Sequence, residues 1–438
     1  MPRLTVTRFP SVLCALVLAA LSVAVACAAP TRARADIRVW EENEDDLWNH
    51  RWLAFSALVQ FGFIARENDP DGPSQDDQLW LQRARFGFRA QLHRYLRLRL
   101  ELDGVPRPAL TDAYLEVPLH RAFTIRAGQQ LVPFLRTNQI AEADQAFLDR
   151  IVYAPQQPDR LALRYLEPRD VGLLFAGLIG NADPEVMSPA LQYSVGAFLG
   201  GAANQLGNAD EALLYTARLS LHVLGPPKNA EQESDLAANT NPHVAVGAAV
   251  YANCDAVGDF DRGVAFDAEF RYRGLHFYAS FLRVYGGGVR SDGLGKLLGY
   301  GGVCGAGATS GSDHVAWGWS AQLQYVLPRL LFPVRTQALE LLARVDGVAP
   351  NNPADGSFLG GGVGSPTYAA PPSFGDADNS PSRWRLTFGL NWFPTRTQIL
   401  RIGINYQLHR ETESALIGGR TVSGIDNDIL WLQATAGF

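Results

Sequence analysis

The chain has 438 residues, a net charge of −6 and 47% hydrophobic residues. Its acidic balance excludes a nucleic-acid-binding protein that works through overall positive charge. Beyond residue 30, no stretch stays apolar for the ~20 residues that a membrane helix needs. Glycine is abundant at 42 residues and aromatic residues make up 10%, which favours many strands joined by tight turns.

A secretory signal peptide is predicted at residues 1–35. Two arginines form a basic n-region, residues 11–26 form an apolar core, and Ala-Arg-Ala at 33–35 offers a cleavage site. A lipoprotein leader ending at Cys27 is the alternative. The acidic stretch 36–51 that follows is too short for a plug domain, and we interpret it as a periplasmic N-terminal extension.

Apolar and polar side chains alternate through residues 52–438 in segments of about ten residues, the length of a tilted strand that crosses a bilayer. Sixteen such strands begin near Trp52, Leu79, Arg94, Leu110, Arg121, Arg169, Ala190, Ala212, His243, Arg262, Gly274, His314, Thr336, Ser382, Thr397 and Asp428. Each backbone group that stays unpaired in lipid costs several kcal/mol. We therefore predict an all-β fold, a closed antiparallel transmembrane β-barrel of about 16 strands.

The lengths of the connections agree with a barrel whose termini lie in the periplasm. Three long connections, 130–168 among them, then fall on the external side, where outer-membrane barrels carry their long loops. The connection 224–242 is the exception, because it is long and periplasmic. Cys254 and Cys304 fall in external loops, where they either form a disulfide or remain two unpaired thiols.

The last segment of the chain places Leu430, Leu432, Ala434 and Ala436 on one face and ends on Phe438. This pattern resembles the C-terminal signal that outer-membrane barrels present to the barrel assembly machinery, so Phe438 is predicted to be the assembly signal. The same alternation also suits a core strand of a soluble secreted β protein, such as a lectin-like sandwich, which is the alternative fold.

A resemblance to a known family lies within residues 112–177. The residues that carry it are Asp112-Ala113-Tyr114, Gly128-Gln129, Pro133-Phe134, Phe147-Leu148-Asp149-Arg150, Arg169-Asp170-Val171-Gly172 and Gly177. On these residues the stretch resembles the phosphate-selective porin O and P family. The resemblance implies a sixteen-stranded barrel, usually a homotrimer, with the third external loop folded into the pore. That loop is Gln130–Pro168 here, and residues 141–150 within it favour one or two helical turns.

The resemblance also implies an anion preference that comes from basic pore residues, including a lysine. The chain has only two lysines, Lys228 and Lys296, and neither falls on a predicted strand or in the third external loop. Arginine offers a fork of donors suited to phosphate or carboxylate. The predicted pore-lining, anion-binding residues are Arg83, Arg85, Arg89, Arg97, Arg99, Arg126 and, on the loop, Arg136.

A weakly selective general porin for small solutes is the alternative function. In that case these arginines form structural ion pairs with carboxylates on neighbouring strands, namely Glu101, Asp103, Asp112 and Glu116. An acidic loop residue, Asp144 or Asp149, then faces the arginine-rich wall.

Enzymatic activity is not predicted. The chain lacks HExxH, CxxC and GxSxG motifs and a phosphate loop that ends in Gly-Lys-Ser/Thr, and its eight histidines show no ligand spacing. No catalytic residue, metal or cofactor is assigned, and an outer-membrane barrel enzyme is a remote alternative. The predicted function is a passive diffusion channel of the bacterial cell outer membrane that prefers anions such as phosphate. Its predicted partners are the lipid bilayer, lipopolysaccharide, the assembly machinery, further copies in a homotrimer and small anionic solutes, with no nucleic acid.

Overall fold

The computed structural model describes residues 37–41, 51–67, 77–105, 109–141, 143–151, 169–200, 203–204, 213–254, 260–286, 314–328, 337–353, 383–411, 415–417, 420–422 and 428–437. The predicted signal peptide, the predicted assembly signal Phe438 and Cys304 lie outside these residues. Each of these, together with the Cys254–Cys304 disulfide, therefore stays a prediction.

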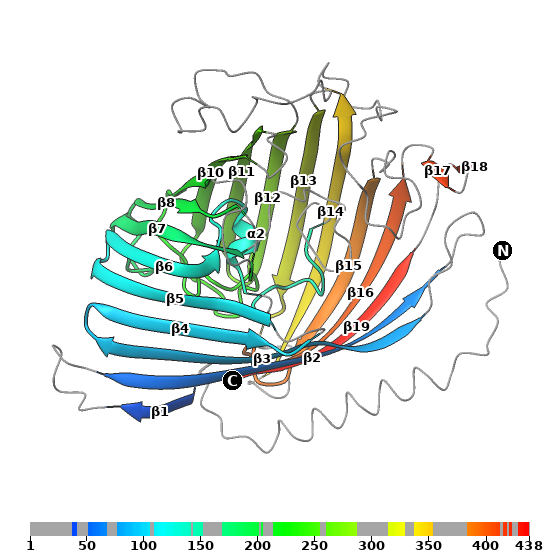
Figure 1. The fold of residues 1–438 in the computed structure, drawn as a ribbon. Coiled ribbons are helices and arrows are strands. Elements are labelled where there is room, and N and C mark those ends of the chain that lie inside the picture. The colour runs from blue at the N-terminus through cyan, green and yellow to red at the C-terminus, as the bar shows by residue number, and fades with distance from the viewer. Residues whose placement is uncertain are drawn as a thin grey trace.

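The main sheet is antiparallel and has 17 strands, and all of them except β1 form a closed barrel (Figure 1). In chain order the barrel strands are β2 (Trp52–Arg66), β3 (Gln78–His93), β4 (Leu96–Asp103), β5 (Ala109–His120), β6 (Phe123–Leu131), β7 (Arg169–Gly180), β8 (Ala190–Phe198), β9 (Leu214–His222), β10 (His243–Cys254), β11 (Phe260–Tyr272), β12 (Leu275–Gly286), β13 (His314–Val326), β14 (Ala338–Pro353), β15 (Arg383–Phe393), β16 (Leu400–Glu411) and β19 (Ile429–Gly437). Ring closure joins β19 to β2, with Ile429 opposite Arg66. Every strand begins within three residues of its predicted start, so the predicted barrel is confirmed.

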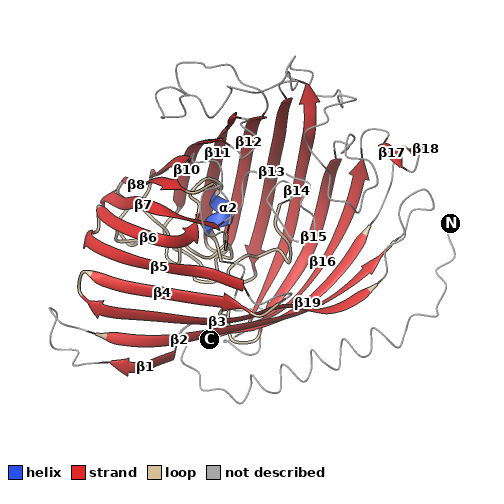
Figure 2. Ribbon diagram, in the orientation of Figure 1, coloured by secondary structure: helices blue, strands red, loops and turns tan. Residues whose placement is uncertain are grey.

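Figure 2 shows that strands account for nearly all the regular structure of the described residues. A separate two-stranded sheet, β17 (Ala415–Ile417) and β18 (Arg420–Val422), lies in the connection before β19. No helix in the described ranges is long and apolar enough to cross a membrane.

The strand outside the ring, β1 (Ile37–Glu41), covers an edge that the barrel leaves open. The last pair between β19 and β2 joins Gly437 to Leu58, so the first residues of β2 extend beyond β19. β1 pairs with these residues, 52–55. An uncovered strand edge offers unpaired backbone groups to other chains, and β1 removes part of that edge. Five residues of the predicted extension 36–51 are therefore a strand, which the sequence reasoning missed.

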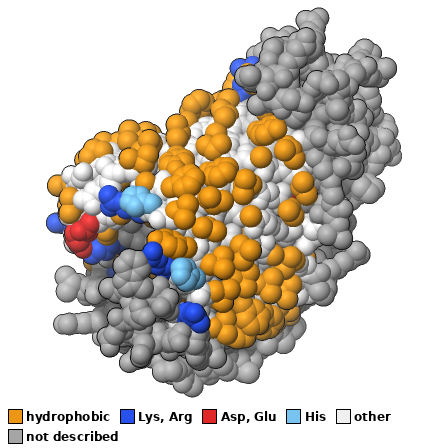
Figure 3. All heavy atoms as spheres, turned by 60° about the vertical axis from the view of Figure 1, so that its left-hand side comes forward, with side chains coloured by type: hydrophobic (Ala, Val, Ile, Leu, Met, Phe, Trp, Pro, Cys, Tyr) orange, Lys and Arg blue, Asp and Glu red, His pale blue; other side chains and the backbone are white. Residues whose placement is uncertain are grey.

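Apolar side chains cover the outside of the barrel. Figure 3 shows them over most of the described part of one face of the wall. Large exposed hydrophobic side chains occur on strand after strand, for example Phe86, Leu98, Leu115, Phe266 and Phe388. A closed sheet with an apolar exterior satisfies its backbone groups within a bilayer. The chain is therefore a barrel of the bacterial outer membrane.

The described part of the third external loop, residues 132–141 and 143–151, lies inside the barrel, as predicted, and carries the short helix α2 (Arg136–Gln139) (Figure 1). Its buried residues Val132, Phe134 and Ile151 join an apolar cluster with side chains of β7–β12 and β14. The ring of Phe134 meets that of Tyr251 edge-on, with 4.9 Å between their centroids. Apolar packing therefore fixes both ends of the described part of the loop to the wall.

Within the described residues 141 and 143–150, the predicted helical turns do not form, and α2 lies nearer the start of the loop. Residues 143–150 run along the opposite wall instead, where strand side chains take up their backbone oxygens. The accepting carbonyls belong to Gln145, Ala146, Asp149 and Arg150. These carbonyl oxygens accept hydrogen bonds from side chains of the wall. In a helix they would instead accept from backbone N–H groups one turn further along the chain.

The long periplasmic connection between β9 and β10 also folds into the barrel. We call residues 223–242 the periplasmic insert. Leu236 packs in an apolar cluster with Val326, Ala338 and Phe393 at the base of β13–β15. Its position explains why this connection is long, since outer-membrane barrels otherwise have short periplasmic turns.

Replacing Gly128 by valine is expected to destabilise the barrel. Gly128 has φ +128, and a Cβ there would lie 2.2 Å from the carbonyl oxygen of Ala113. Strain of this kind costs about 1–3 kcal/mol. The fraction of heat-modifiable barrel on unboiled gels measures the effect. Ala127→Val, on the outward face next to it, is the matched control. Equal fractions of heat-modifiable barrel in the two variants would contradict the expected strain at Gly128.

Candidate functional site: the pore and its constriction

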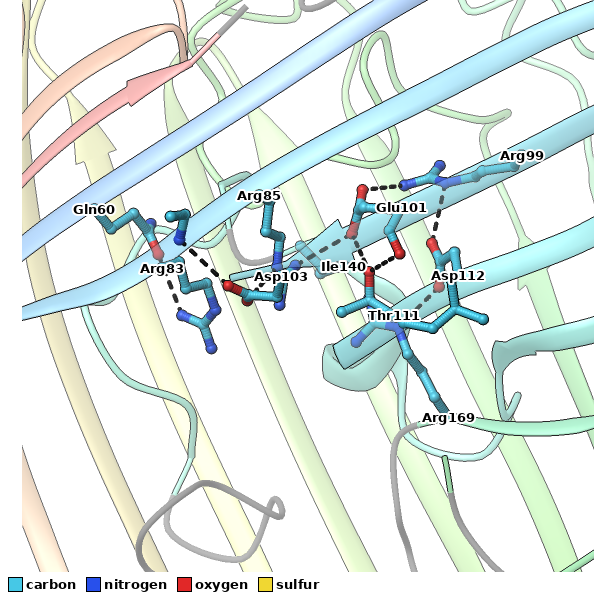
Figure 4. Close-up of polar contacts among 12 residues, drawn as sticks. Gln60, Arg83, Arg85, Arg99, Glu101, Asp103, Thr111, Asp112, Ile140 and Arg169 are labelled. Carbon is cyan, nitrogen blue, oxygen red and sulfur yellow. Dashed lines mark hydrogen bonds and ion pairs between the residues drawn. The ribbon is translucent and has the colours of Figure 1, made fainter. Parts of the chain in front are cut away.

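Arginines and carboxylates alternate on the inner face of β3–β7 and form a network of ion pairs (Figure 4). The Nε atom of Arg85 lies 2.8 Å from Oδ2 of Asp103. On the next strands, the Asp112 carboxylate accepts from Arg99 at 3.0 Å and from Arg169 at 2.8 Å. One carboxylate thus serves two guanidinium groups.

Glu116 is shared in the same way. Its carboxylate oxygens lie 3.2 Å from Arg97 and 2.6 Å from Arg126. The weakly selective alternative predicts ion pairs between these arginines and the carboxylates of Glu101, Asp103, Asp112 and Glu116. The structure contains these ion pairs. Carboxylates are nevertheless outnumbered, because β3–β6 carry six arginines and four acidic residues. We call these ten side chains and Arg169 the arginine ladder.

The remaining arginines of the ladder lie close to the paired ones. Arg83 donates to the side-chain oxygen of Gln60 at 3.2 Å. Arg89 stands directly opposite Arg99 in the sheet, which places two positive charges side by side. The side chains of Arg97 and Arg126 remain 46% and 37% exposed, so solvent reaches the ladder on this wall.

Asp149 fixes the third external loop to the opposite wall. Its carboxylate accepts from Arg344 of β14 at 2.8 Å and from Arg385 of β15. Asp346, which pairs with Arg385 across the sheet at 2.7 Å, completes the buried cluster. Asp149 is therefore not the loop carboxylate that faces the arginine ladder, because both of its oxygens are used on the far side.

Neighbouring backbone groups strengthen this attachment. Asn391 donates to the carbonyl oxygen of Ala146 at 2.7 Å, and Arg401 donates to that of Gln145. Gly403 of β16 allows the Leu148 side chain of the loop to approach the wall closely, since a Cβ at Gly403 would lie 2.6 Å from a methyl carbon of Leu148.

Arg136 lies away from the arginine ladder, contrary to the prediction. Its guanidinium pairs with Glu269 of β11 at 2.9 Å and donates to the carbonyl oxygen of Ala230 in the periplasmic insert. The apolar packing of the loop around α2 directs this side chain toward β11. It ties together two parts of the interior instead of lining the ladder.

The Asp144 carboxyl of the third external loop is influenced by charges of both walls, more by Arg401 of β16 than by Arg99 of the arginine ladder. Burial raises the pKa of Asp144 to about 7, helped by the charge of Glu231, whereas Arg401, a hydrogen bond from Gln232 and Arg99 oppose the rise. Its charge therefore changes near neutral pH, at the point where the third external loop meets the periplasmic insert.

The two walls differ in how far solvent reaches their polar side chains. On β11–β16 the inward polar residues are almost fully buried, including Arg271, Glu340, Arg344, Asp346 and Arg401. The ladder on β3–β6 keeps exposed guanidinium groups. Within the described residues, the water-accessible interior therefore lies along the arginine ladder.

Several residues that shape this interior were not predicted from the sequence. Arg169 stood in the quoted family-like motif but was not assigned to the pore. Arg344 and Arg385 alternate correctly for inward positions, yet their loop partner could not be identified from spacing. Cys254 ends β10. In the described part of the chain, no group of three histidine, cysteine, aspartate or glutamate side chains could hold a metal ion.

Comparisons with known proteins support the fold. No protein-family model matches the chain, and no curated protein is similar to it in sequence. The high-pH structure of Pseudomonas putida OprB has a TM-score of 0.52 at 12% identity, covering 88% of this chain and 94% of that one. An anion-selective porin from Comamonas acidovorans has a TM-score of 0.50 at 10% identity, covering 89% and 100%. The fold is thus that of outer-membrane barrels, and the finer resemblance to phosphate-selective porins stays a prediction.

Replacing Asp149 by asparagine is expected to loosen the third external loop. The change leaves the buried guanidinium groups of Arg344 and Arg385 with one carboxylate fewer, and breaking a buried ion pair costs roughly 3 kcal/mol. A lower urea midpoint and noisier single-channel currents are expected. Asp183→Asn, in an exposed periplasmic connection, is the control, and matching midpoints would show that the attachment contributes little.

Selectivity is expected to depend on pH through Asp144. Because the pKa of Asp144 is about 7, the carboxyl is neutral in acid and negative in base. The positive excess of the wall, and with it the anion preference, should fall between about pH 5.5 and about pH 8.5. Reversal potentials in potassium chloride gradients measure this step. Asp144→Asn should remove it, and a step of full size in that variant would assign it to other groups.

Proposed function

We propose that the chain is a porin, a passive diffusion channel with a preference for small anions such as phosphate. The observation that carries this proposal is the excess of arginine over carboxylate on the wall that solvent reaches. Positive charge on a pore wall concentrates anions and repels cations. Guanidinium groups also offer paired donors to phosphate or carboxylate oxygens.

Shared carboxylates limit the strength of this preference. Asp112 and Glu116 each hold two guanidinium groups, so part of the donor capacity is already used. Lys228 lies in the periplasmic insert and pairs with Glu185, which leaves no lysine on the described barrel wall. Recognition of phosphate would therefore come from arginine alone. A weakly selective porin remains the second candidate, favoured by the ion pairs within the ladder.

The fold is compatible with this activity. The Comamonas acidovorans protein, which has a similar barrel, is an anion-selective porin. A homotrimer, contacts with lipopolysaccharide and delivery by the barrel assembly machinery belong to the same proposal.

Replacing Arg97 and Arg99 by alanine is expected to weaken the anion preference. The double variant removes two positive charges from the exposed wall and leaves Asp112 and Glu116 with fewer counter-charges. We expect the anion-to-cation permeability ratio to fall at least about twofold. The reversal potential of single channels in a planar bilayer under a salt gradient measures it.

Two controls define the outcome. Arg97→Lys with Arg99→Lys keeps the charge and should keep the sign, and Arg121→Ala removes a charge at a periplasmic turn. A cation-selective wild type would overturn the anion preference. An unchanged ratio in the alanine variant would favour the weakly selective porin.

A further inference from the structure

The periplasmic insert is held inside the barrel by the wall around it. The Asp235 carboxylate accepts from the backbone N–H of Gly274 at 2.8 Å, and Arg273 donates its N–H to the carbonyl of Asn239 at the same distance. The Ser234 hydroxyl donates to Glu340 of β14 at 2.9 Å. These contacts span β11 to β14, so the insert rests against the wall that is buried.

The insert also meets the third external loop, which enters from the opposite end of the barrel. The N–H of Ala146 donates to the Glu233 carboxylate at 2.8 Å, and the N–H of Glu233 donates to the carbonyl of Asp144 at 2.9 Å. Arg136 adds a third bond, to the carbonyl of Ala230 at 3.3 Å. Two segments whose bonded residues Ala146 and Glu233 are 87 positions apart are thereby joined in the interior.

Glu233 is central to this junction because its side chain is only 5% exposed. A buried carboxylate is costly unless it is hydrogen-bonded, so loss of the bond from Ala146 would be unfavourable. Through its backbone N–H, Glu233 also bonds the carbonyl of Asp144, so the loop is fixed at two points by one residue of the insert. Movement of Glu233 would therefore move this part of the loop within the interior.

We propose that the periplasmic insert is a second constriction element, and that Glu233 is the positioning residue that couples it to the third external loop. The inference rests on the proposed channel function and deepens it. Together the two segments cover the wall of β11–β16, which confines solutes to the side of the arginine ladder. Small anions must then pass within reach of guanidinium groups instead of crossing a wide pore.

The test compares three variants in planar bilayers. Glu233→Ala removes the acceptor and should give noisier and larger single-channel currents. Glu233→Gln keeps a side-chain oxygen that can accept from Ala146 and should behave like the wild type. Replacing residues 229–239 by a short Gly-Ser linker should raise the conductance roughly twofold and reduce the anion preference. Wild-type conductance in the linker variant, with a heat-modifiable barrel, would overturn the proposal.

A measurement without current separates this inference from the channel function. In a background lacking Cys254 and Cys304, Ser234→Cys places a thiol where the side chain is buried. A water-soluble maleimide should leave it unlabelled in the folded barrel and should label it once Glu233→Ala is added. Rapid labelling in the parent would contradict the buried insert. If the wild-type chain conducts nothing, yet the Ser234→Cys variant protects its thiol in the folded barrel, the porin proposal is defeated and the junction is retained.

Discussion

The need to pair every backbone group within lipid governs the whole molecule. Helices and closed sheets are the solutions available, and this chain closes a sheet by pairing β19 with β2. A ring of sixteen strands encloses more space than wall side chains can fill. The third external loop and the periplasmic insert occupy part of that space, so the shape of the interior follows from closure.

Arginine has two roles here, and its surroundings decide which. Arg344 and Arg385 are covered by the loop and bond its carboxylate and carbonyl oxygens, so they hold structure together. Arg97 and Arg126 share one carboxylate with each other and stay open to water. Buried ion pairs add little net stability but become costly when one partner is lost. The covered wall therefore resists movement, while the open wall is available to solutes.

Period-two alternation was sufficient to predict the strands, because one face meets lipid and the other meets polar groups. The inward position of the loop came from the family resemblance. Contacts between distant segments could not be predicted. Spacing did not distinguish Asp144 from Asp149, since both are loop carboxylates and only packing sends Asp149 to Arg385. Arg136 was misplaced for the same reason. The unusual length of the periplasmic connection was visible, but its partner Ala146 was not.

The short strand β1 bears on how the barrel comes to be sealed. Closure brings together residues as distant as Gln60 and Thr435, which are 375 positions apart, and strand pairing over such separations is intrinsically slow. Until closure, the edge of β2 is open to strand exchange with other copies. β1 comes from the adjacent stretch of chain and pairs with residues 52–55 of β2, which β19 does not reach, so it stays on that edge after closure. The barrel thus carries its own permanent cover for the part of the seam that closure leaves unpaired.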